Sequence, residues 1–126
     1  MIKLIYCLTR HEGLSFEQFS TYWAGEHAAL VRRHAGALGI LRYVQSHTVA
    51  HDANAALREN RGTLPPYDGV AEIHFKDLAS LAAGNLSPQA QAAQAELTAD
   101  EDRFIDRSRS ALFVSEETVV IGRATS

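Results

Sequence analysis

Hydrophobic and polar residues follow two different periods along this chain, and the period distinguishes strands from helices. A two-residue alternation, rich in side chains that favour extended backbone, predicts four strands. These are Ile2–Leu8, residues 41–51, Gly69–Phe75 and residues 112–121, the last interrupted near Glu116. The strands lie at both ends and in the middle of the chain, with helical periodicity between them.

Helical periodicity occurs in two regions. Ser15 and Gln18 have the spacing of a capping box, and the helix that they begin is predicted over residues 16–34. The second region has a helical segment over residues 77–83 and, after a break at a glycine, a longer helix from about residue 88 toward residue 105. The predicted order is therefore β-α-β-β-α-β.

This order is typical of an α+β fold with a ferredoxin-like antiparallel sheet and both helices on one side. A chain of 126 residues makes one domain, residues 1–126. The face of the sheet without helices must also cover its apolar residues, which one small chain cannot do alone. We therefore expect a homodimer through that face of the sheet.

Residues 52–68 interrupt the regular pattern. The segment is polar and contains a glycine and the pair Pro65-Pro66, so the sequence predicts a long surface loop. Loops of this length are uncommon without a function, which makes residues 52–66 a candidate lid over a binding site.

The first predicted helix carries imidazoles on the face that should be buried. The residues of this face recur at helical spacing and form one stripe along the helix. They are Phe16, Phe19, Trp23, His27, Leu30 and His34. A buried imidazole needs a hydrogen-bond partner or a chemical function. His27 is the candidate general acid or base, and Trp23 the candidate wall of a pocket; both are equally compatible with an ordinary core.

The strand that follows carries further polar residues. Tyr43, Gln45 and His47 share one face of it, and Glu72 and His74 alternate with apolar residues on the third strand. If the two strands pair, these side chains would form adjacent polar rows, and a small ligand could lie along them. The alternatives are cross-strand polar pairing and a hydrogen-bonded dimer interface.

Composition excludes several other functions. A net charge of −3 and the lack of a basic patch argue against nucleic-acid binding, and no apolar run is long enough to cross a membrane. A single cysteine excludes an internal disulfide, and the six histidines lack metal-ligand spacing, so no metal site is predicted. We expect a cytoplasmic protein.

Several separated motifs together resemble one known family. They are Phe19-x-x-Tyr22-Trp23-x-x-x-His27, Arg42-Tyr43-Val44-Gln45-x-His47, Asp68-Gly69 and Asp100-Glu101-Asp102-x-Phe104-x-Asp106, with Arg10 and Gly13-Leu14-Ser15-Phe16 upstream. This pattern resembles the EthD-like proteins, named for the ethyl tert-butyl ether degradation cluster that encodes a founding member. The resemblance implies a dimeric α/β-barrel. Distant relatives of that fold include cofactor-independent monooxygenases, isomerases, and dehydratase- or decarboxylase-like proteins.

The resulting hypothesis is a protein that binds a small hydrophobic or aromatic metabolite between the helices and the sheet. If it is an enzyme, His27 would move a proton and Tyr43 and His47 would orient or polarise the substrate, with no cofactor. The expected substrate-binding residues are Trp23, Tyr22, Gln45, Glu72, His74 and Arg10. The acidic residues 100–102 are interpreted as a solvated helix end without a catalytic role.

Two other functions compete with this one. The first is a non-catalytic accessory protein that supports an oxidative, cytochrome P450-type system of ether degradation, as the resemblance implies. The second is a dimeric scaffold whose polar rows only fix the interface. A histidine with a raised or lowered pKa in an open cavity would favour the enzyme, whereas a water-filled or collapsed interior would favour the accessory protein or the scaffold.

Overall fold

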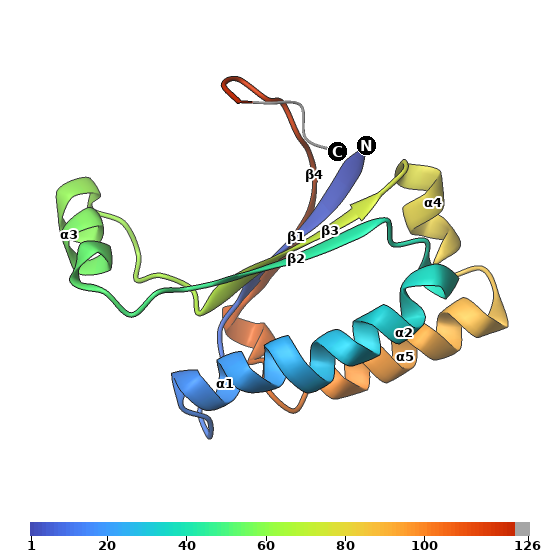
Figure 1. Ribbon diagram of the computed structural model, residues 1–126, viewed down its shortest axis with the longest axis horizontal. Helices are drawn as coiled ribbons and strands as arrows, with labels where there is room; N and C mark the ends of the chain where they lie inside the picture. The colour runs from blue at the N-terminus through green and yellow to red at the C-terminus, as the bar shows by residue number, and fades with distance from the viewer. Residues whose placement is uncertain (123–126) are drawn as a thin grey trace.

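The computed structural model describes residues 1–122 and has the predicted α+β architecture (Figure 1). Its elements follow one another in a β-α-β-β-α-β order with additional short helices. They are β1 (Ile2–Leu8), α1 (Phe16–Tyr22), the π-helical turn η1 (Trp23–His27), α2 (Ala28–Leu38), β2 (Arg42–His47), α3 (Asp52–Arg61), β3 (Gly69–Phe75), α4 (Leu78–Ala83), α5 (Pro88–Glu101), the 3₁₀ turn η2 (Arg107–Arg109) and β4 (Ala111–Glu116).

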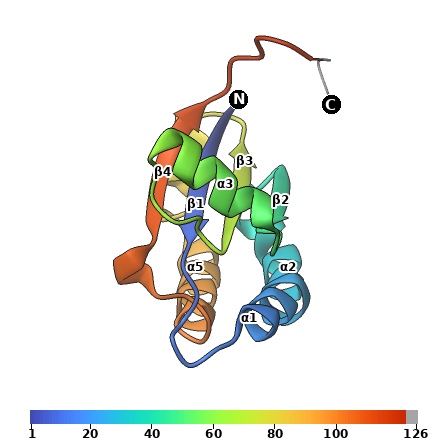
Figure 2. The same ribbon diagram turned by 90° about the vertical axis from the view of Figure 1, so that its left-hand side faces the viewer.

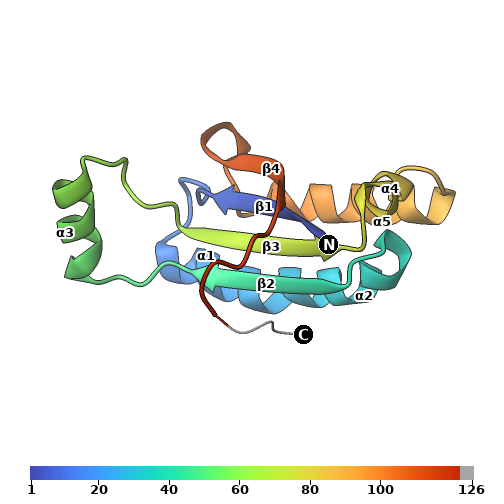
Figure 3. The ribbon, with the colours of Figure 1, turned by 90° about the horizontal axis from the view of Figure 1, so that it is seen from above.

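The four strands form an antiparallel sheet in the order β2-β3-β1-β4, the ferredoxin-like order. Helices α1, α2 and α5 cover one face, and α2 and α5 run side by side beneath it (Figure 2). Figure 3 looks onto the other face, which no helix of the described residues covers. Leu4 and Leu8 point toward the helices, so the intervening Ile5 and Cys7 of β1 point to the open face.

The core has two parts. One gathers around the buried Trp23 and joins the first helix to β1, β3 and the segment after α5; its buried members are Leu8, Phe19, Trp23, Ala71, Phe104 and Ile105. The other lies between α2 and α5, where Ala90 and Ala93 let Val31 and Leu38 approach closely. Together they hold both long helices against the same face of the sheet.

Local chemistry fixes the start of the first helix as the sequence predicts, whereas its end lies four residues beyond the predicted residue 34. The Ser15 hydroxyl accepts a hydrogen bond from the backbone of Gln18 at 3.1 Å, and the backbone of Ser15 donates to the Gln18 side chain at 2.9 Å. The helix continues to Leu38 and ends at Gly39, whose φ of 71° is a left-handed conformation that glycine adopts without strain.

The interior of that helix departs from the expected stripe. The π-helical turn Trp23–His27 inserts one extra residue per turn, so the faces of α1 and α2 are no longer continuous. Trp23 and His27 stay buried, but Val31 replaces Leu30 inside, and His34 is half-buried against Glu96. A regular 100° periodicity cannot reproduce this shift.

Residues 52–68 lie at the surface as predicted, but the expectation that they form only a loop is wrong. The segment contains the helix α3, which stands away from the sheet (Figure 1). The His51 side chain caps it by accepting from the backbone of Ala53 at 2.9 Å, and Gly62 ends it in a left-handed conformation with φ of 65°. Histidine is not among the preferred capping residues, so the start of this helix carries no ordinary signal. We call residues 50–66 the arm.

Candidate active site

A cavity of about 490 Å³ lies between the sheet and helices α2, α4 and α5. Aliphatic and aromatic side chains from all four strands form most of its wall, among them Leu4, Tyr43, Ile73, Phe75 and Leu112. Helix residues such as Val31 and Leu97 complete the wall. A few polar side chains reach it as well: Tyr6, His27, Tyr43, Asn85, Gln94, Thr98 and Glu101. A largely apolar cavity with few polar groups is the usual form of a site for a small molecule.

His27 is the buried imidazole of this cavity, with its side chain 7% exposed. Its Nδ1 lies 2.8 Å from Oδ2 of Asp100, near the end of α5, and its ring packs on Phe104. Since a carboxylate only accepts, Nδ1 donates, and the neutral ring then carries a lone pair on Nε2. Nε2 has no hydrogen-bond partner within residues 1–122, and the surrounding protein atoms do not enclose it completely.

Asp100 is held in place from two sides. Its side chain is 13% exposed, and its second oxygen, Oδ1, accepts a hydrogen bond from the Tyr22 hydroxyl at 2.5 Å. Burial and the neighbouring carboxylate raise the pKa of Tyr22 to about 12, so the phenol keeps its proton and remains a donor. Tyr22 and Asp100 thus orient His27 from behind while the opposite edge of the imidazole faces the cavity.

A second polar group of the wall is the Tyr43 hydroxyl. It lies 3.2 Å from the indole nitrogen of Trp23 and 3.1 Å from the amide nitrogen of Gln45. Gln45 also donates to the backbone carbonyl of Trp23 at 2.8 Å. Burial raises the pKa of Tyr43, against the opposing effect of the hydrogen bonds from Gln45 and Trp23, which favours the protonated phenol.

His47 lies behind Trp23, outside the cavity wall. Its ring packs on the indole with 4.5 Å between centroids, Nε2 is 2.9 Å from Gln45 Oε1, and Nδ1 is 2.5 Å from the Ser20 hydroxyl. Burial lowers the pKa of His47, so the neutral ring is favoured. Both nitrogens are occupied by protein groups, which makes His47 a positioning residue in this arrangement.

The Tyr6 hydroxyl of β1 is a further polar group of the cavity wall. The Tyr6 hydroxyl donates to Glu101 Oε1 at 2.8 Å, and the same oxygen lies 3.4 Å from the guanidinium of Arg107. Burial and the carboxylate of Glu101 raise the pKa of Tyr6 strongly. Its proton is therefore committed to Glu101.

The structure brings together Trp23, His27 and Tyr43 of the predicted site residues, all of which line the cavity. Tyr22, Gln45 and His47 lie one layer behind. Gln45 forms hydrogen bonds with Tyr43 and Trp23 of the wall, His47 packs on Trp23, and Tyr22 is linked to His27 through Asp100. Arg10 lies elsewhere: its Nη1 pairs with Asp68 at 2.6 Å and its Nε donates to the Leu14 carbonyl, so the guanidinium links two loops.

The expectation that Glu72 and His74 form a polar row beside Tyr43, Gln45 and His47 is wrong. β2 and β3 do pair, but Gln45 lies opposite Ala71, so Glu72 and His74 point to the open face of the sheet. There Glu72 forms an ion pair with Lys3 at 2.5 Å. A shift of one residue in register reverses every side chain, and alternation within single strands cannot fix that register.

Sequence reasoning missed Asp100, Tyr6 and Glu101. Residues 100–102 were interpreted as a solvated helix end, but only Asp102 of the three is exposed. The available signal was the phase of α5, since Asp100 and Glu101 follow the buried Ala90, Ala93 and Leu97 at helical spacing. Tyr6 was available from alternation within β1, where it shares a face with Leu4 and Leu8.

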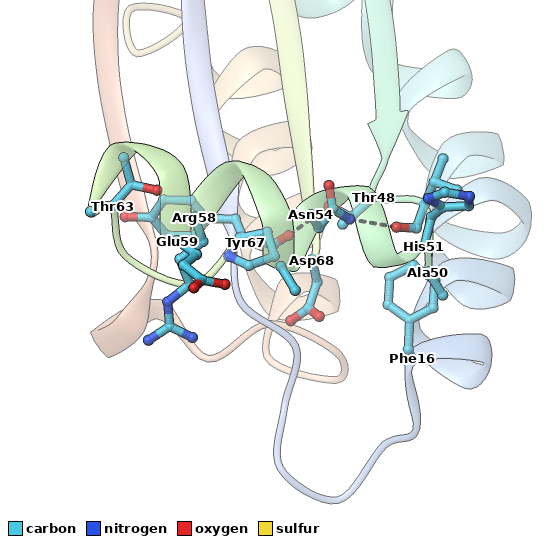
Figure 4. Close-up of a pocket in the computed structure, with 14 residues that line it drawn as sticks. Phe16, Thr48, Ala50, His51, Asn54, Arg58, Glu59, Thr63, Tyr67 and Asp68 are labelled. Atoms are coloured by element: carbon cyan, nitrogen blue, oxygen red, sulfur yellow. Dashed lines mark hydrogen bonds between the residues drawn. The ribbon is translucent and has the colours of Figure 1, made fainter.

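A larger hollow, about 740 Å³, lies between the arm and the ends of β2 and β3 (Figure 4). It is open, and residues 51–67 are exposed except for Asn54. Asn54 Nδ2 is occupied by the Val49 carbonyl at 2.6 Å, and Asp68 by Arg10. The free polar side chains of the hollow, such as Arg58 and Glu59, are solvated, and it lacks the desolvated wall of the helix–sheet cavity, which we take as the candidate site.

Residues 1–122 show neither a metal centre nor a membrane-spanning helix. Three or more histidine, cysteine, aspartate or glutamate side chains nowhere converge on a position for a metal ion in this range. Over the same range, every helix is too short or too polar to cross a bilayer.

The fold and cavity define the class: a ferredoxin-like α+β domain with a small-molecule-sized cavity between sheet and helices. The model of the EthD domain matches residues 11–108, so the chain belongs to the EthD family. No functionally curated protein matches it.

Solved structures show the same fold. An EthD family protein from Bacillus halodurans C-125 is 20% identical, with a TM-score of 0.62 over 94% of this chain and 99% of that one. A protein from Jannaschia sp. CCS1, described as dimeric and ferredoxin-like, is 17% identical (TM-score 0.56, 92% and 98% covered). SnoaB from Streptomyces nogalater, a cofactor-independent oxygenase, is 14% identical (TM-score 0.54, 97% of each chain covered).

Proposed function

We propose that this protein binds a small, largely apolar metabolite in the helix–sheet cavity and acts on it by proton transfer through His27. The observation that carries the proposal is the His27–Asp100 pair: Nδ1 is tied to a carboxylate 2.8 Å away while Nε2 faces an apolar cavity. An imidazole held in one tautomer beside a desolvated substrate is suited to general base and acid catalysis.

Asp100 has two roles in this proposal. It fixes the tautomer and direction of the imidazole, and its negative charge stabilises the imidazolium that forms when Nε2 takes a proton. Tyr22 holds the second carboxylate oxygen at 2.5 Å, so the carboxylate cannot rotate away without losing a hydrogen bond. The proposed chemistry uses side chains alone and requires no cofactor, as in a lyase, isomerase or monooxygenase-type reaction that starts with removal of a proton from the substrate.

We also propose a homodimer through the open face of the sheet. The central row of that face places Phe113 beside Ile5, and Val44 lies on the far side of Glu72. Phe113 is 50% exposed, and a mostly apolar row whose one carboxylate, Glu72, is paired with Lys3 is the kind of surface that a second sheet covers. The dimeric ferredoxin-like relative supports this arrangement.

The binding part of the proposal is tested with the neutral fluorophore N-phenyl-1-naphthylamine. Its emission should rise when it enters the apolar cavity of the wild-type protein. Thr98→Trp, at the wall, should abolish that rise, whereas Ala95→Trp, on the same helix but outside the wall, should retain it. Equal binding by both variants would place the probe elsewhere.

The catalytic part is tested by following exchange of carbon-bound protons from a set of apolar carbon acids in D₂O by NMR. His27→Gln should remove protein-dependent exchange and keep fluorophore binding, because the amide preserves polarity but cannot act as a base. Asp100→Asn should reduce exchange in the same direction. Exchange that is equal in wild type and His27→Gln would contradict the catalytic role and favour the non-catalytic binding protein.

A further inference from the structure

The Tyr43 hydroxyl receives two hydrogen bonds from groups that can only donate toward it. The indole Nε1 of Trp23 has a proton and no acceptor capacity, at 3.2 Å. The Gln45 amide is fixed in orientation because the same nitrogen donates to the Trp23 carbonyl at 2.8 Å, and a carbonyl only accepts. The Gln45 nitrogen at 3.1 Å from Tyr43 is therefore also a donor.

The neighbouring contacts agree with this direction. With its nitrogen facing Tyr43, Gln45 presents Oε1 to His47, so His47 Nε2 carries the proton at 2.9 Å. The neutral ring then accepts on Nδ1 from Ser20 at 2.5 Å. Every hydrogen bond from Ser20 onward therefore runs toward the Tyr43 oxygen, and successive bonds of one direction polarise one another.

Both acceptor positions of the Tyr43 oxygen are occupied, and its own proton has no acceptor within residues 1–122. Tyr43 lines the cavity, and burial raises its pKa, so the proton stays on the phenol. The other tyrosine of the wall differs, because the Tyr6 proton is held by Glu101 at 2.8 Å. The cavity thus has an uncommitted phenolic donor at Tyr43 and an uncommitted basic nitrogen at His27 Nε2, beside the neutral amide and hydroxyl groups of Asn85, Gln94 and Thr98.

We infer that the ligand is an apolar ketone or a tautomer of one, whose carbonyl oxygen accepts the Tyr43 proton while His27 removes a proton from the adjacent carbon. This rests on the proposed function and names its substrate class. The C–H bond breaks, the proton goes to Nε2, and the electron pair forms a C=C bond as the carbonyl becomes an enolate. The Tyr43 O–H stabilises the negative oxygen, and the imidazolium returns the proton to the same or a conjugated carbon.

The pair indane and 2-indanone tests the inference, since the two molecules share one bicyclic frame and differ by a carbonyl oxygen. 2-Indanone labelled with ¹³C at the carbonyl should shift downfield on binding, because hydrogen-bond donation polarises the C=O bond. In D₂O, the protein should accelerate exchange of its α-protons. Tyr43→Phe should lose the shift and slow the exchange by on the order of 10²-fold, the usual effect of losing one oxyanion donor.

Indane binding and Tyr67→Phe are the controls. Tyr43→Phe should bind indane as the wild type does, and Tyr67→Phe, on the exposed segment next to the arm, should leave both ketone readouts unchanged. If 2-indanone binds the wild type without a downfield shift, the inference is overturned whether or not Tyr43→Phe folds. It is equally overturned if exchange depends on His27 but not on Tyr43, which leaves the proposed function intact. If neither indane nor 2-indanone binds, the apolar site itself is wrong and the inference falls with it.

Discussion

The imidazole of His47 lies against the Trp23 indole, and its hydrogen-bond partners Ser20 and Gln45 are neutral. Burial without a compensating charge lowers the pKa of His47 from its usual value near 6.5. The unfolded chain therefore binds the proton more readily than the folded protein. The stabilising contribution of neutral His47 is present above about pH 6.5 and is lost as the pH falls toward the lower folded pKa.

Replacing His47 by Gln should reduce the dependence of stability on pH in this window. The melting temperature of the wild type is expected to fall further between about pH 7.5 and pH 5 than that of His47→Gln, because the variant takes up no proton at residue 47 on unfolding. Thermal unfolding followed by circular dichroism measures the difference. His11→Gln, at an exposed turn, serves as the control. Identical pH dependence in wild type and His47→Gln would contradict the assignment.

Gly69 begins β3 directly under the ring of Trp23. A Cβ at this position would lie 2.4 Å from Cζ3 and 2.7 Å from Cη2 of the indole, and 3.0 Å from the Ser46 carbonyl oxygen. Gly69→Ala should therefore push Trp23 out of place and destabilise the fold by about 1–3 kcal/mol, the usual effect of overpacking. Gly36→Ala, on α2 with open space around it, should be neutral or stabilising by up to about 1 kcal/mol.

Denaturant unfolding followed by intrinsic fluorescence suits this comparison because Trp23 is the single tryptophan of the chain. A change in native emission should accompany the loss of stability in Gly69→Ala only. Equal stability of the two glycine variants would show that the indole can move without loss.

At the scale of elements, capping and periodicity predicted most of the fold. The capping box at Ser15, the Ser87-Pro88 start of α5 and the bounds of β3 agree with the sequence analysis. The π-helical turn η1 left no such trace, because its extra residue is stabilised by tertiary contacts rather than by a local motif. One of these is the hydrogen bond from Gln45 to the Trp23 carbonyl.

The same limit explains the site. Helical spacing identified Trp23 and His27, which belong to one helix, and strand alternation identified Tyr43. Asp100 was not predicted as a site residue, because its contact with His27 depends on how α5 packs against the first helix. A mixed-charge segment at a helix end is usually solvated. Contacts between distant elements follow from packing, which a single sequence does not specify residue by residue.

The arm was expected to be a lid over the binding site, and the structure gives it a different position. None of residues 50–66 lines the helix–sheet cavity, and the two chain ends at its base are adjacent, since the Thr48 backbone donates to the Asp68 carbonyl at 3.1 Å. Replacing residues 50–66 by a short glycine-containing turn should therefore leave the fold and N-phenyl-1-naphthylamine binding intact. Fluorescence titration measures this. A clear loss of affinity with a folded protein would restore the earlier hypothesis of a lid.

At the scale of the whole molecule, the sheet has one face covered by its own helices and one without cover in the described residues. The open face is mixed: Phe113 and Ile5 are neighbours in its central row, and Lys3 forms ion pairs with Glu72 and Glu117 toward one end. Glu72 lies within that row, between Ile5 and Val44, and its ion pair with Lys3 neutralises its charge, so a second sheet could cover the face without burying an unpaired carboxylate. The cavity lies on the other side of the sheet, so dimer formation leaves it unobstructed.

Phe113→Glu should separate the proposed dimer. The carboxylate would be placed in the apolar row beside Ile5, where a partner sheet would remove it from water without an opposite charge, so association should become unfavourable. In the monomer the same side chain is solvated, because Phe113 is already 50% exposed, and the fold should persist. Light scattering coupled to size exclusion measures the mass, and Leu86→Glu, 79% exposed in the α4–α5 connection, is the matched control. A wild-type dimer that persists in Phe113→Glu would mean that another surface joins the protomers, whereas dissociation together with unchanged fluorophore binding would place interface and site on opposite faces of one sheet.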